Sequence, residues 1–404
     1  MAADLDFVLG EAFDNLINED ELRKKLGKDR PLRVKLGIDP TASDIHLGFA
    51  VVLRKLRQFQ ERGHTAVLIL GDYTAQIGDP SGRSVTRPRL SKEQVDAHAA
   101  TYVEQLHQVL LPEPLEIRRN SEWLATMDIE DVLRLASQAT VAQMLQRDDF
   151  ANRYANGQPI SVMEFLYPLL QGWDSVMVEA DIELGGSDQL WNFLMARALQ
   201  THAGQEPQVV LTMPLLVGLD GVQKMSKSLG NYVGIAEAPT EQFGKLMSVP
   251  DELMPQYFDL ATGWPLAHAT KVKRELSTGA VKPVEAKRLL ARTVVDLYHG
   301  DGSGAAAEGE FDRVFVAHEV PDDVPDVQIP PDEVRDGRIR VATLVARAFP
   351  KAVTSNKDGR RKIVQGGVSL DGELVTDADL DVAPADVDGK LLQLGRRNWA
   401  RLRA

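Results

Sequence analysis

The N-terminal part of the chain alternates short apolar runs with a longer segment of helical periodicity. Residues 32–38 form the first apolar-rich run, and residues 67–70 form the second. Between them, apolar side chains recur at helical spacing over residues 47–59, and either Ser43 or Asp44 is the expected N-cap. Short apolar runs of this kind are typical of buried parallel strands. This part of the chain therefore predicts a strand, a helix and a second strand in a βαβ unit.

The same alternation continues along the chain and predicts the fold class. Helical periodicity extends over residues 92–109, 129–146 and 188–199, and shorter apolar segments occupy residues 115–118, 209–211 and 215–219. Beyond residue 230 the pattern is mostly helical as far as residue 298. We expect an α/β fold with a doubly wound parallel sheet, followed by a helical region.

The C-terminal part differs in composition and charge from the rest. Residues 300–309 are rich in Gly, Ala and Ser, and residues 321–331 combine prolines with acidic residues, so both segments are typical of links. Residues 335–404 contain 14 Lys and Arg against 9 Asp and Glu, whereas the whole chain has a formal net charge of -13. Either a nucleic-acid contact confined to this end or chance clustering on a solvated face explains the asymmetry.

The composition excludes several kinds of site. The 404 residues include no cysteine, which excludes disulfides, thiolate nucleophiles and cysteine-ligated metals. The eight histidines show no metal-ligand spacing, so we expect no metal site in the protein itself. No stretch approaches the roughly 18 apolar residues of a membrane span, and the first residues lack the pattern of a signal peptide. We expect a soluble cytoplasmic protein that does not bind a membrane.

The segment that joins the first predicted strand to its helix carries the first candidate chemistry. In a doubly wound sheet such a turn lies at the carboxyl edge, where ligands bind, and a helix N-terminus offers free N–H groups to a phosphate. His46 falls in the first helical turn, where its imidazole can donate to a phosphoryl oxygen. Gly48 lets a flat ring approach the backbone. The alternative is an ordinary capped helix with an exposed histidine.

A second motif follows about 180 residues later. It reads Lys224-Met225-Ser226-Lys227-Ser228 and is flanked by Gly221 and Gly230. Two ammonium groups three residues apart, in a loop with glycines on both sides, suit a mobile segment that grips a polyphosphate. A solvated basic loop is the alternative, but a fully specified string of five residues rarely arises by chance.

Together the two motifs resemble the two signatures of class I aminoacyl-tRNA synthetases. The resemblance narrows to the bacterial tyrosyl-tRNA synthetases, whose characteristic segments are similar to residues 78–82, 167–174, 185–189 and 250–254. It covers nearly the whole chain. By this resemblance we expect a Rossmann-like catalytic domain over residues 1–220 with a helical insertion at about 124–160, and a signature loop and helical domain over 221–320. A linker would span 321–337, and a small α+β RNA-binding domain of the alpha-L type would span 338–404.

The resemblance also implies a substrate and a set of roles. Asp79, Tyr167 and Gln171 would surround the ammonium group of L-tyrosine, Asp174 would accept its phenolic hydroxyl, and Gln189 would contact its carboxyl group. Gly37 would line the same pocket. ATP would be bound by the following residues: Asp39, Thr41, His46, Gly48, Phe49, Asp188, Lys224, Met225, Ser226, Lys227 and Ser228. A helix N-cap is the alternative role of Asp188, and an ordinary core position is the alternative for Tyr167.

The implied reaction has two steps. The tyrosine carboxylate would attack the α-phosphate of ATP, with Mg²⁺ brought in by the nucleotide, and the acyl group would then pass to the terminal ribose of tRNA(Tyr). Catalysis would consist of positioning and electrostatic stabilisation, in which His46, Lys224 and Lys227 are the catalytic residues.

Two positions depart from the family pattern. Phe49 stands where most of the family has the second histidine of the first signature, and a phenyl ring cannot donate a hydrogen bond. Lys35 stands where one branch of the family has a tyrosine that contacts the substrate phenol. Another branch has a lysine there, so Lys35 is interpreted as a marker of that branch, and its entry into the pocket stays open.

The resemblance assigns partners to two further regions. In the tail, Lys357, Arg360, Arg361 and Lys362 would contact RNA phosphates, which position RNA without reading its sequence. The insertion would form the interface of a homodimer, with candidate apolar residues Leu133, Leu135, Val141, Met144 and Leu145, although an internal core explains these residues equally well.

Three other functions compete with this interpretation. A tryptophanyl-tRNA synthetase shares the fold and the signatures, but the Tyr167, Gln171 and Asp174 set disfavours it. An RNA-binding scaffold descended from a synthetase is permitted by Phe49 and disfavoured by the intact lysines of the signature loop. A ligase that adenylates a small acid without tRNA leaves the basic tail unexplained.

Overall fold

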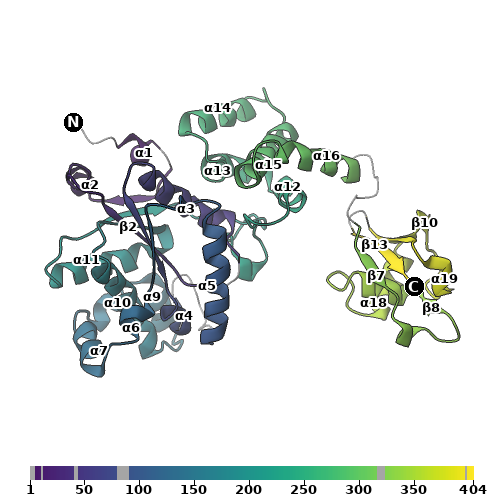
Figure 1. Ribbon diagram of the computed structural model, residues 1–404, viewed down its shortest axis with the longest axis horizontal. Coiled ribbons are helices and arrows are strands. Elements are labelled where there is room, and N and C mark those ends of the chain that lie inside the picture. The colour runs from purple at the N-terminus through teal and green to yellow at the C-terminus, as the bar shows by residue number, and fades with distance from the viewer. Residues whose placement is uncertain (1–4, 11, 41–43, 80–90, 316–323, 396–397) are drawn as a thin grey trace. The chain divides into compact units, whose positions relative to one another are not determined.

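The computed structural model describes residues 5–10, 12–40, 44–79, 91–315, 324–395 and 398–404 (Figure 1). The chain divides into two compact units, Met1–Gly304 and Ala305–Ala404. Each unit has its own sheet and is described by itself.

The first unit contains a six-stranded sheet with the order β1-β6-β5-β2-β3-β4. The strands are β1 (Asn15–Ile17), β2 (Arg33–Ile38), β3 (Thr65–Leu70), β4 (Leu115–Arg119), β5 (Ile182–Gly186) and β6 (Val209–Met213). All neighbours from β6 to β4 pair in parallel, and β1 joins β6 antiparallel at the edge. The expected α/β fold with a doubly wound parallel sheet is therefore confirmed.

Helices cover both faces of this sheet (Figure 1). Helix α3 (Leu47–Gln60) packs on β2, β3 and β5, and α11 (Leu190–His202) packs on β5 and β6. The other helices of the sheet domain are α1 (Asp6–Leu9), α2 (Glu19–Leu26), α4 (Thr74–Ile77), α5 (Lys92–Leu106), α6 (Ser121–Leu124), α7 (Ile129–Ala136), α8 (Val141–Met144), α9 (Asp148–Ala155), α10 (Val162–Met177) and the 3₁₀ turn η1 (Ser187–Gln189). Winding proceeds from β2 to β3 in one direction and from β5 to β6 in the other, so β2 and β5 meet at the switch point where doubly wound folds bind ligands.

Helices α10 and α11 pack closely because α10 has a glycine at the contact. A Cβ on Gly172 would lie 2.8 Å from Leu199 Cδ1 and 3.1 Å from Ala196 Cα. Only glycine therefore allows this approach. The contact fixes α10, which carries Gln171 and Asp174, against α11.

After the sheet, the chain forms the signature loop and a set of helices. These elements are η2 (Lys227–Leu229), α12 (Pro239–Met247), η3 (Asp251–Leu253), α13 (Met254–Leu260), α14 (Leu266–Ser277) and α15 (Pro283–His299), whereas α16 (Ser303–Phe315) begins at the end of this unit and belongs mostly to the second one. Arg54 of α3 joins them to the sheet domain, since its guanidinium donates to the Tyr298 hydroxyl at 2.9 Å and to the Ala261 carbonyl at 3.3 Å.

The N-cap expected for α3 is wrong. His46 caps the helix, because its Nδ1 accepts the Phe49 N–H at 3.2 Å. Asp44 lies before this cap and is free to face the signature loop, and Ser43 lies outside the described residues.

The helix expected over residues 129–146 is instead two helices, α7 and α8. Thr140 starts the second one through a capping box with Gln143, and this local bonding competes with a continuous helix. The strand expected at residues 215–219 is also wrong, since only an isolated bridge between Val217 and Lys224 forms there. Strand β5 was not predicted, because a charged Glu183 and two final glycines hide its apolar pattern.

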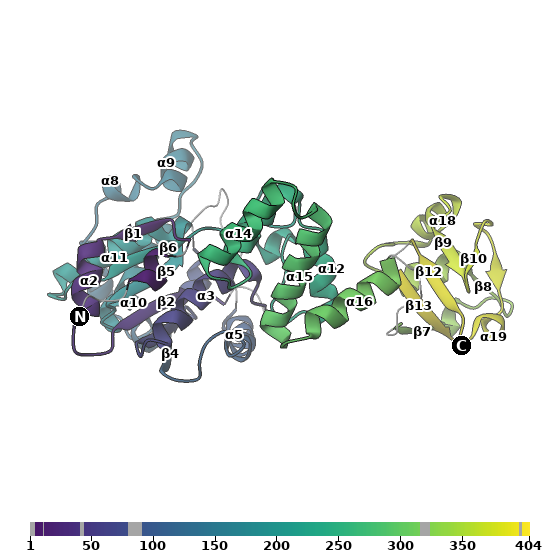
Figure 2. The ribbon, with the colours of Figure 1, turned by 90° about the horizontal axis from the view of Figure 1, so that it is seen from above.

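The second unit is a small α+β domain (Figure 2). Its five-stranded sheet has the order β10-β9-β12-β13-β7, and a separate pair joins β8 to β11. The elements are β7 (Asp326–Gln328), η4 (Pro331–Glu333), β8 (Ile339–Arg340), α17 (Val341–Ala348), α18 (Asn356–Val364), β9 (Val368–Leu370), β10 (Glu373–Leu374), β11 (Asp381–Val382), α19 (Pro384–Val387), β12 (Leu391–Leu394) and β13 (Asn398–Arg403). Residues 326–328, expected within a linker, thus form a strand that pairs in parallel with β13.

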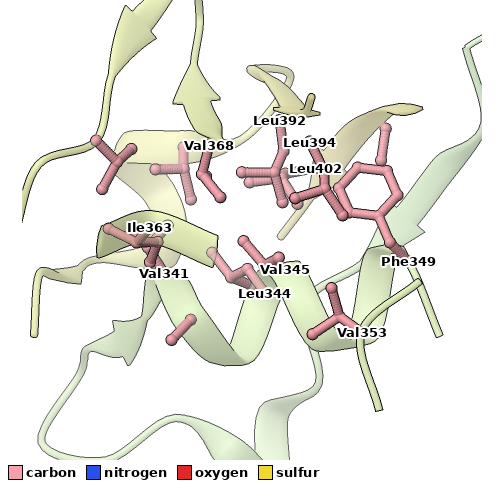
Figure 3. Close-up of a cluster of buried hydrophobic side chains, with 14 of the residues drawn as sticks. Val341, Leu344, Val345, Phe349, Val353, Ile363, Val368, Leu392, Leu394 and Leu402 are labelled. Carbon is pink, nitrogen blue, oxygen red and sulfur yellow. The ribbon is translucent and has the colours of Figure 1, made fainter. Parts of the chain in front are cut away.

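The core of this domain lies between its helices and one face of its sheet. Figure 3 shows Val341, Leu344 and Val345 of α17 facing strand residues that include Leu392 and Leu402. All five are at most 1% exposed. The domain therefore has a core of its own, which is what independent folding requires.

Candidate active site

A cavity of about 590 Å³ opens at the carboxyl ends of β2 and β5. Residues 36–39, which end β2, and 184–189, which follow from β5, line it together with the first turn of α3 and the signature loop. Nearly all expected site residues border it, namely Gly37, Asp39, His46, Gly48, Phe49, Asp79, Tyr167, Gln171, Asp174, Asp188, Gln189 and residues 224–228. Thr41 and residues 80–82 lie outside the described residues. The cavity thus brings together motifs that lie about 180 residues apart in the sequence.

Asp174 is the buried carboxylate of this cavity. It is 4% exposed, and its Oδ1 accepts the indole N–H of Trp123 at 2.8 Å while its Oδ2 accepts an amide N–H of Asn120 at 3.3 Å. Burial raises the pKa of Asp174 to about 7, although the charge of Lys35 and the two donors oppose that rise. Asp174 therefore titrates near neutral pH and accepts hydrogen bonds best above it.

Trp123 and Asn120 were not found by sequence reasoning. They lie just before the insertion, in and next to α6, and match no motif. The one available signal is that a buried indole N–H needs an acceptor.

Asp39 and Tyr167 form a second polar pair on the wall of the cavity. The Tyr167 hydroxyl donates to Asp39 Oδ2 at 2.8 Å, and the Thr74 hydroxyl donates to Asp39 Oδ1 at 2.8 Å. Burial, with the neighbouring carboxylates, raises the pKa of Tyr167 well above its ordinary value, so it stays a neutral donor. Sequence reasoning missed Thr74, which also accepts an amide N–H of Asn120 at 3.0 Å.

A cluster of amides holds Asp79 and the two expected glutamines. Gln189 Nε2 donates to Asp79 Oδ2 at 2.9 Å, and Asn192 Nδ2 donates to Gln171 Oε1 and to Gln189 Oε1, both at 2.9 Å. Arg147 in turn donates to Asn192 Oδ1 at 2.8 Å. Asn192 was not predicted, but its position three residues after Gln189 on one helix face was the available signal.

His46 is held as a neutral donor. Because its Nδ1 accepts the Phe49 N–H, its proton belongs on Nε2, which is then available to a ligand. Burial, together with the charge of Lys224, lowers the pKa of His46 to about 4. A Cβ on Gly48 would lie 3.2 Å from His46 Nδ1 and 3.4 Å from Met225 Cβ, so Gly48 also permits the close approach of the signature loop to α3.

Carboxylates on the cavity wall hold both lysines of the signature loop. Lys224 Nζ donates to Asp188 Oδ2 at 2.6 Å, and Lys227 Nζ pairs with Asp44. The loop itself is shaped by Asn231, whose Oδ1 accepts the Ser226 N–H at 2.8 Å. Asp44 and Asn231 belong to no motif that sequence reasoning identified.

Lys35 does not line the cavity. Its side chain is fully buried beneath it, where it pairs with Glu183 at 2.7 Å. The question that the sequence left open is thereby answered: Lys35 is not among the residues that line the cavity, whereas Asp174 is.

In the tail, the expected RNA-binding residues differ in their surroundings. Arg360 makes a bidentate pair with Asp379, in which one N–O distance is 2.8 Å, and Arg361 pairs with Asp358 at 2.5 Å. Lys357 and Lys362 make no ion pair with a carboxylate in the described part of the chain. A phosphate could therefore bind either lysine without first displacing a carboxylate, as it would have to do at Arg360 and Arg361.

The insertion splits the apolar residues proposed for an interface. Leu133 and Val141 are 63% and 62% exposed, whereas Leu135 and Met144 are buried. Large apolar side chains that are similarly exposed nearby are Ile129 at 74%, Tyr154 at 69% and Val162 at 77%.

No described helix is long and apolar enough to cross a membrane. Within the described ranges, no group of three or more His, Asp or Glu side chains is arranged to hold a metal ion.

The chain has close relatives of known name. The family model of the class I tRNA synthetases (W and Y) matches residues 27–316. The tyrosine–tRNA ligase of Moorella thermoacetica is 50% identical over 382 residues, 95% of this chain and 90% of that protein. Tyrosine–tRNA ligase 2 of Vibrio parahaemolyticus is 48% identical over 96% of this chain and 95% of that protein.

The fold has solved counterparts. A C-terminally truncated mitochondrial tyrosyl-tRNA synthetase of Aspergillus nidulans matches with a TM-score of 0.64 at 22% identity, covering 78% of this chain and 94% of that one. The fold, the cavity at the switch point and these relatives agree, and the chain belongs to the class I tRNA synthetases, within them to the tyrosine–tRNA ligases.

Proposed function

We propose that the cavity activates L-tyrosine with ATP and that the tyrosyl group then passes to tRNA(Tyr). The observation that carries this proposal is that one cavity is lined both by a buried carboxylate, Asp174, and by the two lysines of the signature loop. A phenol hydroxyl needs a hydrogen-bond acceptor, and a polyphosphate needs positive charge. The cavity offers a carboxylate for the first and two ammonium groups for the second.

Asp174 reads the substrate hydroxyl. Its two oxygens already accept from Trp123 and Asn120, and each carboxylate oxygen has a lone pair left for the phenol. An amino acid without that hydroxyl would leave a buried charge short of one donor, at a cost of about 1–3 kcal/mol or more. The acceptors of Asp79, Gln171 and the Tyr167 oxygen suit the ammonium group, and the Gln189 amide suits the carboxyl group.

His46, Lys224 and Lys227 stabilise the charge that develops on the phosphates. The tyrosine carboxylate oxygen bonds to the α-phosphorus while the bond to the pyrophosphate oxygen breaks. For this, ATP must displace the carboxylates of Asp188 and Asp44 from the two ammonium groups. Asp188, once released, accepts from the ribose hydroxyls. Each preorganised donor contributes roughly 10² to 10³ in rate.

Mg²⁺ enters with ATP as part of the substrate. This octahedral ion keeps several waters and is usually held through phosphates and few protein ligands. In the second step a ribose hydroxyl of the tRNA attacks the acyl carbon, and AMP leaves with its phosphate oxygen.

The tail domain binds the tRNA through Lys357 and Lys362, with Arg360 and Arg361 contributing where RNA phosphate displaces their carboxylate partners. Such binding weakens as salt rises, because counterions are released. Since its partner is a tRNA, we place the enzyme in the cytoplasm.

A homodimer forms through the insertion. Ile129 and Leu133 lie one turn apart on α7, and both are exposed, as is Val141. Exposed apolar side chains that gather in one segment are typical of a protein–protein interface.

The test of this function is ATP–pyrophosphate exchange with each of the twenty amino acids, followed by charging of tRNA(Tyr). We expect exchange with tyrosine alone. Exchange with tryptophan would assign the chain to the sister specificity. Exchange with none, together with intact tRNA binding, would favour the RNA-binding scaffold instead.

A further inference from the structure

A buried lysine lies directly beneath the amino-acid pocket. Lys35 is in the middle of β2 and is 0% exposed, while the next residues along the strand, Leu36 and Gly37, line the cavity. Side chains alternate along a strand, so Lys35 and Gly37 point to the same face of the sheet. The Lys35 ammonium contacts Gln171 and Ser175, so Lys35 lies on the face of the sheet that α10 covers.

The Lys35 ammonium has a partner for each of its three N–H groups. It donates to Glu183 Oε1 at 2.7 Å, to the Ser175 hydroxyl at 2.7 Å and to the Gln171 carbonyl at 3.2 Å. Glu183 is its direct neighbour in register on β5 and is 1% exposed. Glu183 Oε2 in turn accepts from Ser175 at 3.3 Å and from Gln208. The network is therefore satisfied on both sides.

These bonds attach one turn of α10 to the sheet. Gln171 and Ser175 are the two ends of that turn, and Asp174 lies between them. The turn that Lys35 holds is thus the one that presents both Gln171 and Asp174 to the substrate.

Lys35 also acts on Asp174 through its charge. It is the largest influence that opposes the rise in the pKa of Asp174 caused by burial. Among the titratable groups around Asp174, Asp39 acts in the other direction, and Tyr167 is neutral. The hydrogen-bond donors Trp123 and Asn120 assist Lys35.

We propose that Lys35, paired with Glu183, is a positioning residue for tyrosine recognition: its hydrogen bonds hold the Gln171–Ser175 turn on β2, and its charge favours the carboxylate form of Asp174, which accepts the tyrosine hydroxyl. This inference rests on the proposed function of the cavity. Stability alone does not account for the pair, since replacing a buried ion pair by a well-packed neutral pair is often neutral or stabilising.

The test replaces both charges at once, so that neither partner is left buried and unpaired. In Lys35→Gln/Glu183→Gln two amides can still hydrogen-bond, and in Lys35→Met/Glu183→Leu the pair is apolar. The apolar double variant is measured in place of the amide variant if the amide variant does not fold. Lys25→Met is the matched control, because Lys25 is also 1% exposed and its Nζ donates to Asp181 O at 3.2 Å, in an ion-pair cluster that does not act on Asp174.

The readout is the KM for tyrosine in ATP–pyrophosphate exchange between pH 6 and 9, with phenylalanine as a second substrate. In the wild type, KM for tyrosine should rise as pH falls below about 7. In the neutral variants that rise should begin at a higher pH, and a shift of about one pKa unit would raise KM for tyrosine at pH 7 roughly 5-fold above wild type. KM for phenylalanine, which has no hydroxyl to donate, should not rise as pH falls, and in Lys25→Met both substrates should keep their wild-type pH profiles.

The outcomes separate the two proposals. A KM for tyrosine that changes by the same factor at every pH would mean that the pair only holds the turn, and would overturn the role of the Lys35 charge in this inference. If the wild type exchanges with tyrosine but the double variants show the wild-type dependence of KM on pH, the inference about Lys35 is overturned. The proposed function of the cavity then stands. A wild type that does not exchange with tyrosine would overturn the function itself.

Discussion

At the scale of single residues, the proposed specificity for tyrosine depends on the surroundings of one carboxylate, Asp174. Burial favours the neutral form of Asp174. The charge of Lys35 and the hydrogen bonds from Trp123 and Asn120 favour the ionised form. The resulting pKa of Asp174 is about 7, so the carboxylate is ionised above neutral pH and becomes protonated below it. Substitutions around Asp174 should therefore change tyrosine recognition in a pH-dependent way.

Trp123→Phe removes the indole donor and keeps most of the packing. We expect a higher pKa of Asp174 and a KM for tyrosine that rises roughly 10-fold at pH 7, because a hydrogen bond to a charged group is worth about 1.5–3 kcal/mol. Exchange kinetics at pH 7 and 9 measure this. The change should be smaller at pH 9, and equal losses at both values would contradict the assignment.

Asp174→Asn tests the same carboxylate through stability. The folded pKa of about 7 lies above the ordinary value of 3.8, so between these values the folded state holds the proton more tightly than the unfolded chain. The contribution of Asp174 to stability is therefore present at low pH and is lost as pH rises through about 7. The unfolding free energy of the variant relative to wild type should increase from pH 5 to 8 in urea titrations. A difference that is constant with pH would show that Asp174 titrates normally.

His46 carries a prediction of the opposite kind. With a pKa of about 4 it is neutral throughout the working range, so the rate of tyrosine activation should show no inflection from His46 between pH 5.5 and 8. His46→Ala should lower the rate of adenylate formation by roughly 10² to 10³ with little change in KM for tyrosine. Single-turnover kinetics separate these two effects, and a large change in KM alone would place His46 in binding.

The sequence identified residues with motif chemistry but not the residues that hold them. His46, Asp174 and the loop lysines stand in recognisable strings, whereas Trp123, Asn120, Asn231 and Asp44 act only through contacts between segments distant in the chain. Such contacts depend on the fold and leave no local pattern.

At the scale of elements, the site exists because β2 and β5 meet where the winding of the sheet reverses. The unit from β2 through α3 to β3 could be predicted, since its apolar periods are clean. Strand β5 could not, because Glu183 and its two final glycines interrupt the apolar run. The glycines line the cavity, and Glu183 pairs with the buried Lys35. Local propensity failed where the residues serve binding and positioning.

Substitutions on helix α7 test the proposed dimer. Ile129→Glu together with Leu133→Glu places charges on two side chains that are 74% and 63% exposed, so the fold should survive. We expect a monomer by analytical ultracentrifugation at micromolar concentration. Val364→Glu, on a side chain of α18 that is also 74% exposed, is the control and should stay a dimer. A double variant that remains dimeric would place the interface elsewhere.

At the scale of the whole molecule, charge is unevenly distributed along the chain. The tail carries an excess of basic residues in an otherwise acidic chain, so RNA contact can be localised without attracting RNA to the whole surface. The composition of residues 335–404 could indicate this, but which of its basic side chains are already paired required the structure.

Lys357→Glu with Lys362→Glu should separate the two half-reactions. Exchange with tyrosine should be unchanged, while charging of tRNA(Tyr) should lose roughly 10-fold or more in kcat/KM at moderate salt, and less at high salt. Arg338→Glu with Arg347→Glu changes the charge equally at side chains already bound within the tail, and is the control. Equal losses in both variants would indicate a general charge effect.

The measurement that tests the account most directly compares tyrosine with phenylalanine in ATP–pyrophosphate exchange, for the wild type and Asp174→Ala. The wild type should prefer tyrosine by roughly 10² or more in kcat/KM, and the variant should lose that preference mainly through lower activity with tyrosine. If the variant keeps the wild-type preference, Asp174 does not read the hydroxyl, and the assignment of the pocket is wrong.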